Sequence, residues 1–429
     1  MTYKETLEFL YSQLPAYHRI GKAAYKNDLN NSLTLDDYFG HPHRKYRTIH
    51  VAGTNGKGSV SHMIASILQE AGYRTGLYTS PHLKDFRERI KVNGKMISEK
   101  DVIDFVKNNT SIIESLHPSF FEMTVAMAFN HFAESNVDIA IIEVGLGGRL
   151  DSTNIIKPVL SVITNIGFDH MDLLGNTLEQ IASEKAGIIK KNVPVVIGET
   201  HPATEELFLS QASAAGSAIS FADKRFSCEF GEYYFDQKAR GYMITDLISQ
   251  SKSEGETVLT GDYQYRNLMT VFNTINILND ILIITNVNIK DGLRNVVLNT
   301  GLKGRWQTLN LDPLTICDTG HNREALEFNM VQINRIKKSG LHMVIGFVND
   351  KDIESFLPLF PTDAVYYFTK ASIPRALNEE ILRSKSERYG LYGLGYPDVK
   401  TALFHATKNA APSDLIFIGG STFIVGEII

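Results

Sequence analysis

The first three hundred residues alternate between short apolar runs and longer stretches in which apolar residues recur at helical spacing. Apolar or β-branched runs predict buried strands at Ile49–Val51, Gly76–Tyr78, Val137–Val144, Val159–Ile163 and Val193–Ile197. The stretches between them predict helices, for example around Val102–Val106, Phe121–Phe132 and Ile181–Ile189. Buried strands that alternate with helices are typical of a mostly parallel sheet covered on both faces. The pattern therefore predicts a doubly wound α/β domain.

The pattern changes after the fifth of these strands, where short segments with partly alternating polarity predict antiparallel hairpins. Cys228–Phe235 and Gly241–Ile244 are two such segments. We interpret the region of about 213–259 as a small β-rich subdomain inserted into the first domain. A helix predicted over Arg266–Ile284 returns the chain to the main body of that domain.

A second α/β pattern begins near Gly301 and continues to the end of the sequence. Its apolar runs predict strands at Leu314–Asp318, Leu341–Phe347, Val365–Phe368 and Leu415–Ile418. We therefore expect a P-loop-type, doubly wound domain over residues 1–300, which contains the small β-subdomain. A second, smaller Rossmann-like α/β domain is expected over residues 301–429, close to the size of a typical domain.

Composition narrows the class of protein further. With 429 residues, the chain is long enough for two or three domains, each with its own core. A net charge of -5 gives no electrostatic footprint for nucleic acid, and no basic block suggests a membrane surface. No apolar run approaches the roughly 18 residues of a membrane-spanning helix, and the first residues are too acidic for a signal peptide. Cys228 and Cys317 are the only cysteines and lie far apart in the sequence, which fits a reducing compartment and argues against a disulfide scaffold. We therefore expect the protein to be cytoplasmic.

The run Thr48–Ser59 carries the strongest chemical signal in the sequence. A predicted strand breaks at Gly53 into the loop G-T-N-G-K-G-S, which contains Lys57 and is followed by a helical pattern. In this context the loop amides and the helix N-terminus face an anion, and the lysine reaches toward the outer phosphates. The loop is tighter than a standard Walker A motif, because Gly58 follows the lysine where Ser or Thr is usual. A glycine-rich surface turn is the alternative interpretation.

Three polar residues follow different predicted strands. Ser80, Glu143 and His170 stand at or soon after the ends of the second, third and fourth strands. Open α/β sheets bind ligands at the carboxyl edge of their strands, and a carboxylate there would hold magnesium. Taken singly, a salt-bridged glutamate and a structural histidine are the alternatives. The convergence of the three strand ends is what predicts a magnesium site.

Eight sequence blocks occur in order along nearly the whole chain. They are G-T-N-G-K-G-S (53–59), T-S-P-H-L (79–83), E-V-G-L-G-G-R-L-D-S-T-N (143–154), D-H-x-x-x-L-G (169–175), S-E-K-A-G-I (183–188), G-x-x-Q-x-x-N (261–267), G-R-W (304–306) and D-T-G-H-N (318–322). Together they resemble the folylpolyglutamate synthase/dihydrofolate synthase family, within the Mur ligase superfamily. The phosphate loop alone indicates the superfamily, whereas the R-L-D-S-T-N and S-E-K-A-G-I blocks point to the folate branch.

The resemblance implies an ATP-dependent amide ligase. In the family, ATP phosphorylates a carboxylate of a pteroate or folate, and the amine of L-glutamate then attacks the acyl phosphate. Because phosphorylation supplies the leaving group, the protein's task is positioning and charge neutralisation. The resemblance also implies Mg²⁺ as cofactor, dihydropteroate or reduced folates as acceptors, and a monomeric protein.

The resemblance assigns the nucleotide and metal contacts residue by residue. The ATP phosphates would be cradled by the loop residues Asn55, Gly56, Lys57, Gly58 and Ser59. Further ATP contacts would come from Asn267, Arg305 and Asp318. Two magnesium ions would be held by Ser80, Glu143 and His170.

The resemblance also assigns catalytic residues, which are Lys57, Lys185 and His321. Lys185 matches a lysine that is carbamylated in the family, and the carbamate would turn this cation into an anionic oxygen ligand facing the second metal. The sequence pattern alone does not separate Lys185 from Lys190 or Lys191. His321 and Ser421 are assigned to the phosphate or the incoming glutamate.

The acceptor side follows from two aligned segments. Bifunctional members of the family contact dihydropteroate through segments that match Phe121, Glu122, Met123, Thr124, Leu150, Asp151 and Ser152. The Gly-Arg-Leu-Asp stretch favours the presence of both synthase activities. The sequence leaves two other functions open, a UDP-muramoyl amino-acid ligase of the same superfamily and a nucleotide-gated ATPase switch. The first is expected to need a uridine-binding domain before the loop, and the second leaves the block at 318–322 without a role.

Overall fold

The computed structural model describes residues 1–15, 28–234 and 238–429, which form two compact units. Unit 1 consists of Met1–Glu229, Gly241–Thr257 and Tyr265–Gly301. Unit 2 consists of Phe230–Arg240, Val258–Gln264 and Leu302–Ile429. The second unit therefore takes two short segments from the middle of the chain in addition to its C-terminal part. None of the helices in the described parts of the chain combines the length and apolar character needed to cross a membrane.

Unit 1 is built on an eight-stranded sheet with the strand order β4-β3-β2-β5-β1-β6-β7-β8. The strands are β1 (Arg47–Ala52), β2 (Thr75–Tyr78), β3 (Ile90–Val92), β4 (Lys95–Met96), β5 (Ile139–Glu143), β6 (Leu160–Ile163), β7 (Val195–Ile197) and β8 (Ile219–Phe221). All neighbouring strands from β2 to β8 pair in parallel, and only β3 and β4 run antiparallel at the edge. The five strands predicted from apolar runs are confirmed. The structure adds three short ones that lie toward the edges of the sheet.

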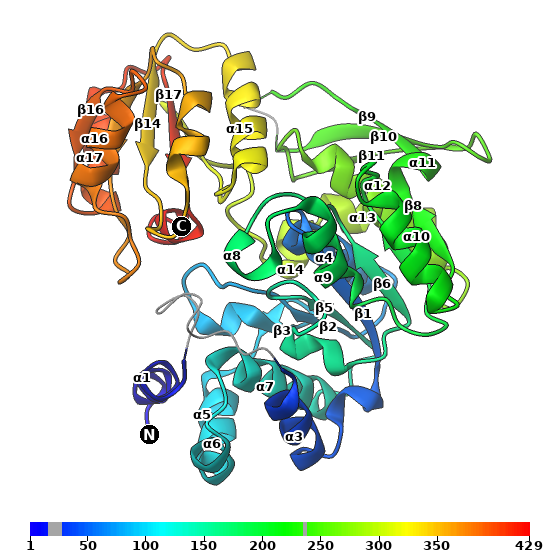
Figure 1. Cartoon of the computed structure of the whole chain (residues 1–429). Coiled ribbons are helices and arrows are strands. Elements are labelled where there is room, and N and C mark those ends of the chain that lie inside the picture. The colour runs from blue at the N-terminus through cyan, green and yellow to red at the C-terminus, as the bar shows by residue number, and fades with distance from the viewer. Residues whose placement is uncertain (16–27, 235–237) are drawn as a thin grey trace. The chain divides into compact units, whose positions relative to one another are not determined.

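The helices in the described part of unit 1 pack on this sheet and on one another (Figure 1). They are α1 (Tyr3–Gln13), α3 (Asn30–Tyr38), α4 (Lys57–Glu70), α5 (Glu99–Asn108), α6 (Thr110–Leu116), α7 (Phe120–Glu134), α8 (Met171–Leu174), α9 (Leu178–Ala186), α10 (Glu205–Ala214), α11 (Ala222–Arg225), α12 (Gln264–Leu278), α13 (Asn286–Arg294) and α14 (Val296–Thr300). Helix α4 packs against β1, β2 and β5, while Ala140 and Ile142 join the core cluster of α7. Every residue of β5 is buried, as expected for a central strand covered on both faces.

Three predicted bounds differ from the structure. The antiparallel sheet consists of β9 (Phe226–Phe230), β10 (Arg240–Asp246) and β11 (Lys252–Thr257), so it begins later than residue 213. Strand β8 was included in the predicted subdomain, but it pairs in parallel with β7 as part of the main sheet. The strand predicted to reach residue 235 ends at residue 230, and residue 235 itself lies outside the described residues.

Two predicted helices end earlier than expected. Helix α12 ends at Leu278 rather than Ile284, because Asn279 and Asp280 form a turn in place of a further helical turn. Helix α9 ends at Ala186, where Gly187 packs directly against Arg149. A Cβ atom at Gly187 would lie 2.4 Å from the Cα atom of Arg149. Only glycine permits so close an approach.

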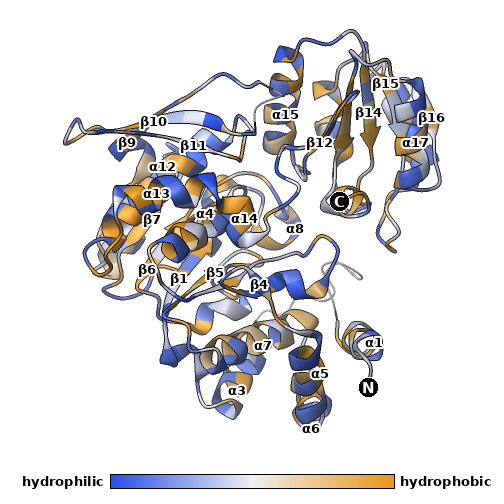
Figure 2. Cartoon of the chain, turned by 180° about the vertical axis from the view of Figure 1, so that it is seen from behind, coloured by the Kyte–Doolittle hydropathy of each residue, from blue (hydrophilic) through white to orange (hydrophobic). Residues whose placement is uncertain are grey.

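Unit 2 contains a six-stranded sheet with the order β12-β13-β17-β14-β15-β16. The strands are β12 (Gln307–Leu311), β13 (Leu314–Cys317), β14 (Leu341–Ile345), β15 (Val365–Phe368), β16 (Gly393–Gly395) and β17 (Leu415–Gly419). The helices are α15 (Arg323–Arg335), α16 (Glu379–Glu387), α17 (Val399–Asn409) and α18 (Thr422–Gly426). The four predicted strands are confirmed. In Figure 2 the central strand β14 is largely hydrophobic, whereas the edge strands β12 and β16 are too exposed to produce a continuous apolar run.

Candidate active site

The glycine-rich loop connects β1 to α4 and has a backbone that only glycine tolerates. Gly53 has a φ angle of 148° and Gly56 one of 85°. A Cβ atom would lie 1.8 Å from the Thr164 hydroxyl oxygen at Gly53, and 2.3 Å from Asn267 Oδ1 at Gly56. The close approach brings Asn267, on α12, against the loop. The loop and the first turn of α4 thus form the glycine-rich connection from strand to helix that is typical of phosphate-binding sites.

The segment after β6 holds the loop in place. The backbone N–H of Asn55 donates to Asn165 Oδ1 at 2.8 Å, and the Thr54 hydroxyl donates to the Gly167 carbonyl at 3.1 Å. The Thr164 hydroxyl donates to the Asn55 carbonyl. The sequence reasoning missed these supporting residues, although their signal was available, since β6 is a strand whose end reaches the same sheet edge.

Two lysine amines converge on one carbonyl of the loop. Lys57 Nζ donates to the Gly53 carbonyl at 3.0 Å and to the Thr54 carbonyl at 3.2 Å. Lys185 Nζ donates to the same Gly53 carbonyl at 2.9 Å. Lys185 is only 3% exposed, and burial, together with the nearby charge of Lys57, lowers its pKa to about 7. The structure therefore distinguishes Lys185 from other lysines, because close to half of its amine is neutral at pH 7.

The low pKa of Lys185 predicts a specific pH dependence of stability. In the unfolded chain the lysine keeps its proton up to about pH 10.5, whereas the folded protein loses it near pH 7. Between these values the unfolded state binds more protons, so stability rises with pH, at a slope approaching ~1.4 kcal/mol per pH unit. Lys185→Met removes this titration. We therefore expect the variant's stability advantage to be largest below about pH 7 and to shrink toward about pH 9.

Urea unfolding at a series of pH values in CO₂-free buffer measures this difference. Lys191→Met is the matched control, because Lys191 is exposed and lies five residues after the end of α9. Its stability relative to wild type should not change with pH. A gap between Lys185→Met and wild type that stays constant with pH would contradict the lowered pKa.

The R-L-D-S-T-N block binds the helix that carries Lys185. The Arg149 guanidinium forms an ion pair with Glu184 at 2.8 Å, and the Arg149 backbone N–H donates to the Glu184 carbonyl at 2.8 Å. The Asn154 amide donates to the carbonyls of Arg149 and Gly187, each at 3.0 Å. The two blocks that point to the folate branch are therefore partners in space, and together they position Lys185.

The structure brings two of the three predicted metal residues into contact. The backbone N–H of Ser80, which follows β2, donates to Glu143 Oε2 at 3.0 Å. Glu143 is the buried last residue of β5. His170 has a left-handed backbone, and its N–H donates to Asp169 Oδ1 at 2.8 Å. No group of three His, Cys, Asp or Glu side chains suited to a metal is found in the described part of the chain.

The acceptor segment 121–124 forms the first turn of α7. Glu122 and Ser119 form a capping box, in which the Ser119 N–H donates to Glu122 Oε2 at 2.6 Å. Met123 has no exposed surface, and the Thr124 hydroxyl donates to the Phe120 carbonyl at 2.6 Å. Phe121 is half-buried, and its ring centroid lies 6.1 Å from that of Tyr78. Contacts of these residues with a substrate stay a prediction.

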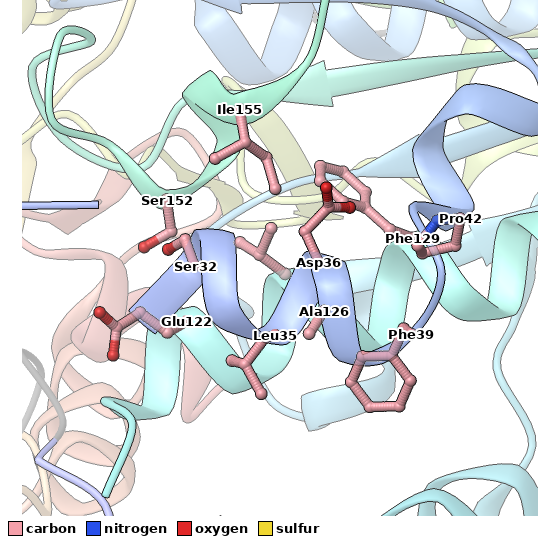
Figure 3. A pocket seen from close by; sticks show the side chains of 11 residues that line it. Ser32, Leu35, Asp36, Phe39, Pro42, Glu122, Ala126, Phe129, Ser152 and Ile155 are labelled. Atoms are coloured by element: carbon pink, nitrogen blue, oxygen red, sulfur yellow. The ribbon is translucent and has the colours of Figure 1, made fainter. Parts of the chain in front are cut away.

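The second acceptor segment, 150–152, leads into a short 3-10 helix. The partly buried Leu150 precedes Asp151, whose Oδ1 accepts from the Thr153 N–H and whose Oδ2 accepts from the Leu146 N–H. Burial raises the pKa of Asp151, although these hydrogen bonds lower it. Ser152 lines a small pocket together with Glu122 (Figure 3).

This pocket lies between α3, α7 and the 3-10 helix of residues 152–155. Ser32, Glu122 and Ser152 gather at one end of it in Figure 3. The buried Ser32 hydroxyl has no hydrogen-bond partner within the described residues. Leu35 and Phe129 are among the apolar side chains of its wall. Such a mixture of apolar walls with a few polar groups is typical of small-molecule sites.

Asp318 organises the predicted nucleotide residues of unit 2. Its Oδ2 accepts from the Tyr263 hydroxyl at 2.7 Å and from the Trp306 N–H at 2.8 Å. Its Oδ1 accepts from the Gly320 N–H at 2.7 Å and from the Asn329 amide at 3.0 Å. Asp318 therefore fixes the backbone beside Arg305, which directly precedes Trp306 in the chain.

The remaining two residues lie at the carboxyl ends of β13 and β17. His321 is half-buried, with Nδ1 3.1 Å from the Thr319 carbonyl. Ser421 is buried, and its hydroxyl accepts from the Phe423 N–H at 3.1 Å to cap α18. The Asp318 N–H donates to the Ile418 carbonyl at 3.1 Å, which ties the two strand ends together. His321 and Ser421 thus belong to one edge of the unit 2 sheet.

Comparison with known proteins identifies close relatives of the whole chain. Residues 51–275 match the family model of the Mur ligase middle domain, and residues 304–422 match that of the Mur ligase glutamate ligase domain. The chain is 34% identical over 420 residues to the dihydrofolate synthase/folylpolyglutamate synthase of Bacillus subtilis, and the aligned residues cover 95% of each protein. It is 30% identical over 447 residues to the folylpolyglutamate synthase of Lacticaseibacillus casei, covering all of this chain and 98% of that protein.

Solved structures agree with these relatives. A crystal structure of folylpolyglutamate synthase from Thermotoga maritima is 32% identical, with a TM-score of 0.82 over 99% of this chain and 95% of that one. E. coli FolC in complex with DHPP and ADP is 26% identical, with a TM-score of 0.85 over 100% of this chain and 97% of that one. Mycobacterium tuberculosis folylpolyglutamate synthase complexed with ADP is 27% identical, with a TM-score of 0.87 over 99% of this chain and 97% of that one.

Proposed function

The chain belongs to the folylpolyglutamate synthase/dihydrofolate synthase family of the Mur ligase superfamily, and on this premise we propose how its residues divide the work of the reaction. The protein is an ATP-dependent ligase that joins L-glutamate to a pteroate or folate acceptor. Because relatives over nearly its full length are folate enzymes, the UDP-muramoyl alternative loses its support. The observation that carries the assignment of residues is the convergence of Lys57 and Lys185 on the Gly53 carbonyl at the end of β1.

The reaction we propose has two steps. An acceptor carboxylate oxygen attacks the γ-phosphorus of ATP, which forms an acyl phosphate and releases ADP. The amine of L-glutamate then attacks the acyl carbon, so that the amide bond forms, phosphate leaves and the amine loses a proton. Neither step needs a covalent bond to the protein. The residues therefore act by positioning and by neutralising charge.

Lys57 and the loop residues from Asn55 to Ser59 are assigned to the phosphates of ATP. The Lys57 amine already lies over the loop through its bonds to the Gly53 and Thr54 carbonyls. A cation held at this place neutralises the negative charge that shifts to ADP as it leaves in the first step. Asn267 supports this assignment, because it packs against Gly56.

We assign magnesium to Ser80, Glu143 and His170. The donor set is chemically suitable, because a carboxylate and a hydroxyl supply the hard oxygen ligands that Mg²⁺ prefers. The contact between the Ser80 N–H and Glu143 supports a shared site at the ends of β2 and β5. When bound, Mg²⁺ supplies charge neutralisation at the phosphates. His170 is the third candidate ligand, and Asp169 holds its backbone.

The proposed carbamate on Lys185 is supported by the state of its amine. CO₂ reacts with a neutral amine, forming an N–C bond and releasing one proton. The pKa of about 7 keeps a large share of the Lys185 amine neutral at physiological pH. The carbamate would supply an anionic oxygen ligand at the phosphate end of the site.

The acceptor is assigned to Phe121, Asp151 and Ser152 and to the pocket of Figure 3. Ser152 and Glu122 line this pocket, and the unpartnered Ser32 hydroxyl in it supports a polar ligand group. Residues 1–300 are proposed as the ATP-binding domain. Residues 301–429 are proposed as the glutamate ligase domain, with Arg305 and Asp318 on the nucleotide and His321 and Ser421 on the phosphate or glutamate. The location in the cytoplasm and the monomeric state are further proposals.

A product assay tests whether both synthase activities are present. The purified protein is incubated with ATP, Mg²⁺ and L-glutamate, together with either dihydropteroate or a reduced monoglutamyl folate. We expect mass spectrometry to show one added glutamate in both tubes. Addition to the folate alone would remove the dihydrofolate synthase activity and leave the ligase mechanism in place. Addition in neither tube would contradict the proposed function.

A further inference from the structure

Arg89 is a buried cation of unit 1 to which the proposed mechanism gives no role. It ends the 3-10 helix Phe86–Arg89 and is only 4% exposed. Its Nε donates to His82 Nδ1 at 2.8 Å, and its guanidinium lies 5.3 Å from the centroid of the Phe120 ring. Among the described residues no carboxylate forms an ion pair with it. Neutral partners do not balance the charge of a buried cation, so a position of this kind suits an anion supplied by a ligand.

Tyr78 is the second polar group of this cluster, and its hydroxyl neighbours the Arg89 guanidinium. Its side chain is completely buried on β2, and within the described residues its hydroxyl has no hydrogen-bonding neighbour other than this guanidinium. A phenol whose oxygen lies beside a guanidinium still has its own O–H group to donate in a hydrogen bond. A guanidinium and a phenol side by side form a donor pair suited to a planar carboxylate.

The cluster lies between the two halves of the proposed site. On one side, Tyr78 is two residues before Ser80, and the charge of Glu143 acts on both Tyr78 and Arg89. On the other side, the Tyr78 ring lies 6.1 Å from the Phe121 ring, and the charge of Asp151 acts on Tyr78. An acceptor that spans these halves must place its reacting carboxylate in between.

The surrounding side chains favour an aromatic acid over a phosphate. The Phe120 ring stacks on Tyr11, with centroids 5.2 Å apart, and meets Phe86 edge to face at 5.8 Å. Aromatic side chains pack well against an aryl ring, whereas a triphosphate among them would leave most of its charge unpaired. The phosphates also have their own loop at the end of β1.

We propose that Arg89 and Tyr78 bind the acceptor carboxylate that ATP phosphorylates. This inference rests on the proposed function. The guanidinium holds the carboxylate in its ionised, nucleophilic form, and the Tyr78 hydroxyl fixes one oxygen so that the other faces the phosphate. Both residues touch the reacting group and act before the phosphoryl transfer.

Equilibrium binding to two ligands tests the proposal. The ligands are dihydropteroate and the same molecule with hydrogen in place of the carboxylate. We expect wild type to prefer dihydropteroate by roughly 10- to 100-fold, the range given by charge-assisted hydrogen bonds. In Arg89→Met the two ligands should bind with about equal affinity, because the preference for the carboxylate is lost. Binding of the carboxylate-free molecule and of ADP should stay unchanged. Tyr78→Phe should reduce the preference by a smaller factor.

Arg87→Met is the matched control. Arg87 lies in the same 3-10 helix, but it has its own carboxylate partner, Asp85, at 2.7 Å. Its removal should leave the preference for dihydropteroate as in wild type. If Arg89→Met does not fold, Arg89→Lys and Tyr78→Phe carry the test, since both preserve most of the side-chain volume.

Three results would overturn the proposal. An equal loss for both ligands would make Arg89 a structural residue, and an unchanged preference would give it no role in acceptor binding. A loss of ADP binding with the carboxylate preference intact would place a nucleotide phosphate at Arg89. Each of these can occur in a protein whose wild type still forms product. A wild type that neither binds dihydropteroate nor forms product would instead remove the proposed function itself, and this proposal with it.

Discussion

Lys185→Ala should reduce ligase activity to below roughly 1% of wild type, because the variant loses the anionic group assigned to the metal end of the site. The amine that it removes is buried and bonded to the Gly53 carbonyl. Since the proposed active form is the carbamate, short carboxylates such as formate or acetate should enter the vacated space and restore part of the activity. Steady-state assays with and without these carboxylates measure the rescue.

The control for this variant is Lys191→Ala, which changes an exposed lysine close to the same helix. It should retain wild-type activity and show no response to formate. Native mass spectrometry in bicarbonate buffer should show wild type with the added mass of one CO₂. The Lys185→Ala variant should lack this adduct. A fully active Lys185→Ala protein, with no CO₂ adduct on wild type, would refute the carbamate.

Lys57→Ala should lower kcat/KM for ATP by roughly 100- to 1000-fold, the usual effect of removing one preorganised charge or donor from a transition state. The physical reason is the position of Lys57, which opens α4 and is held over the loop by two backbone carbonyls. Acceptor binding should change much less, because Lys57 belongs to the phosphate loop. Initial rates at varied ATP and varied folate separate the two effects.

Lys95→Ala provides the comparison for Lys57. Lys95 is an exposed residue of β4 at the edge of the same sheet, so its removal should not alter kcat/KM. Near-normal turnover by Lys57→Ala would take the loop lysine out of the mechanism. Lys57→Arg should fall between wild type and the alanine variant, since it restores the charge with different geometry.

The strands at the centre of both sheets followed directly from the sequence. Ile139–Ile142 and Leu415–Ile418 are continuous apolar runs because they are buried on both faces. Edge strands escaped the same reasoning. Strand β16, for example, has three residues, two of them glycines, and is partly exposed, so no periodic signal marks it. Short edge strands are fixed by their neighbours more than by their own residues.

The residues of the candidate site also divide into those that the sequence predicted and those that it did not. The phosphate loop was readable because its requirement is local, namely a backbone at Gly53 and Gly56 that only glycine adopts. Arg89 gave no such signal, since it stands in a charged run, R-E-R, that is typical of a solvated surface. Its burial comes from Phe120 and Tyr78, which other parts of the chain supply.

The sequence by itself determined the order of strands and helices, the phosphate loop and the blocks that place the chain among folate ligases. These features depend on residues that are neighbours in the chain, or on spacings that a helix or strand repeats. Only the tertiary structure decided which lysine is special. Lys185 and Lys190 look alike in sequence, yet only Lys185 shares the Gly53 carbonyl with Lys57. Burial and neighbouring charge set a pKa, and both arise from segments that are distant in the sequence and meet only in the fold.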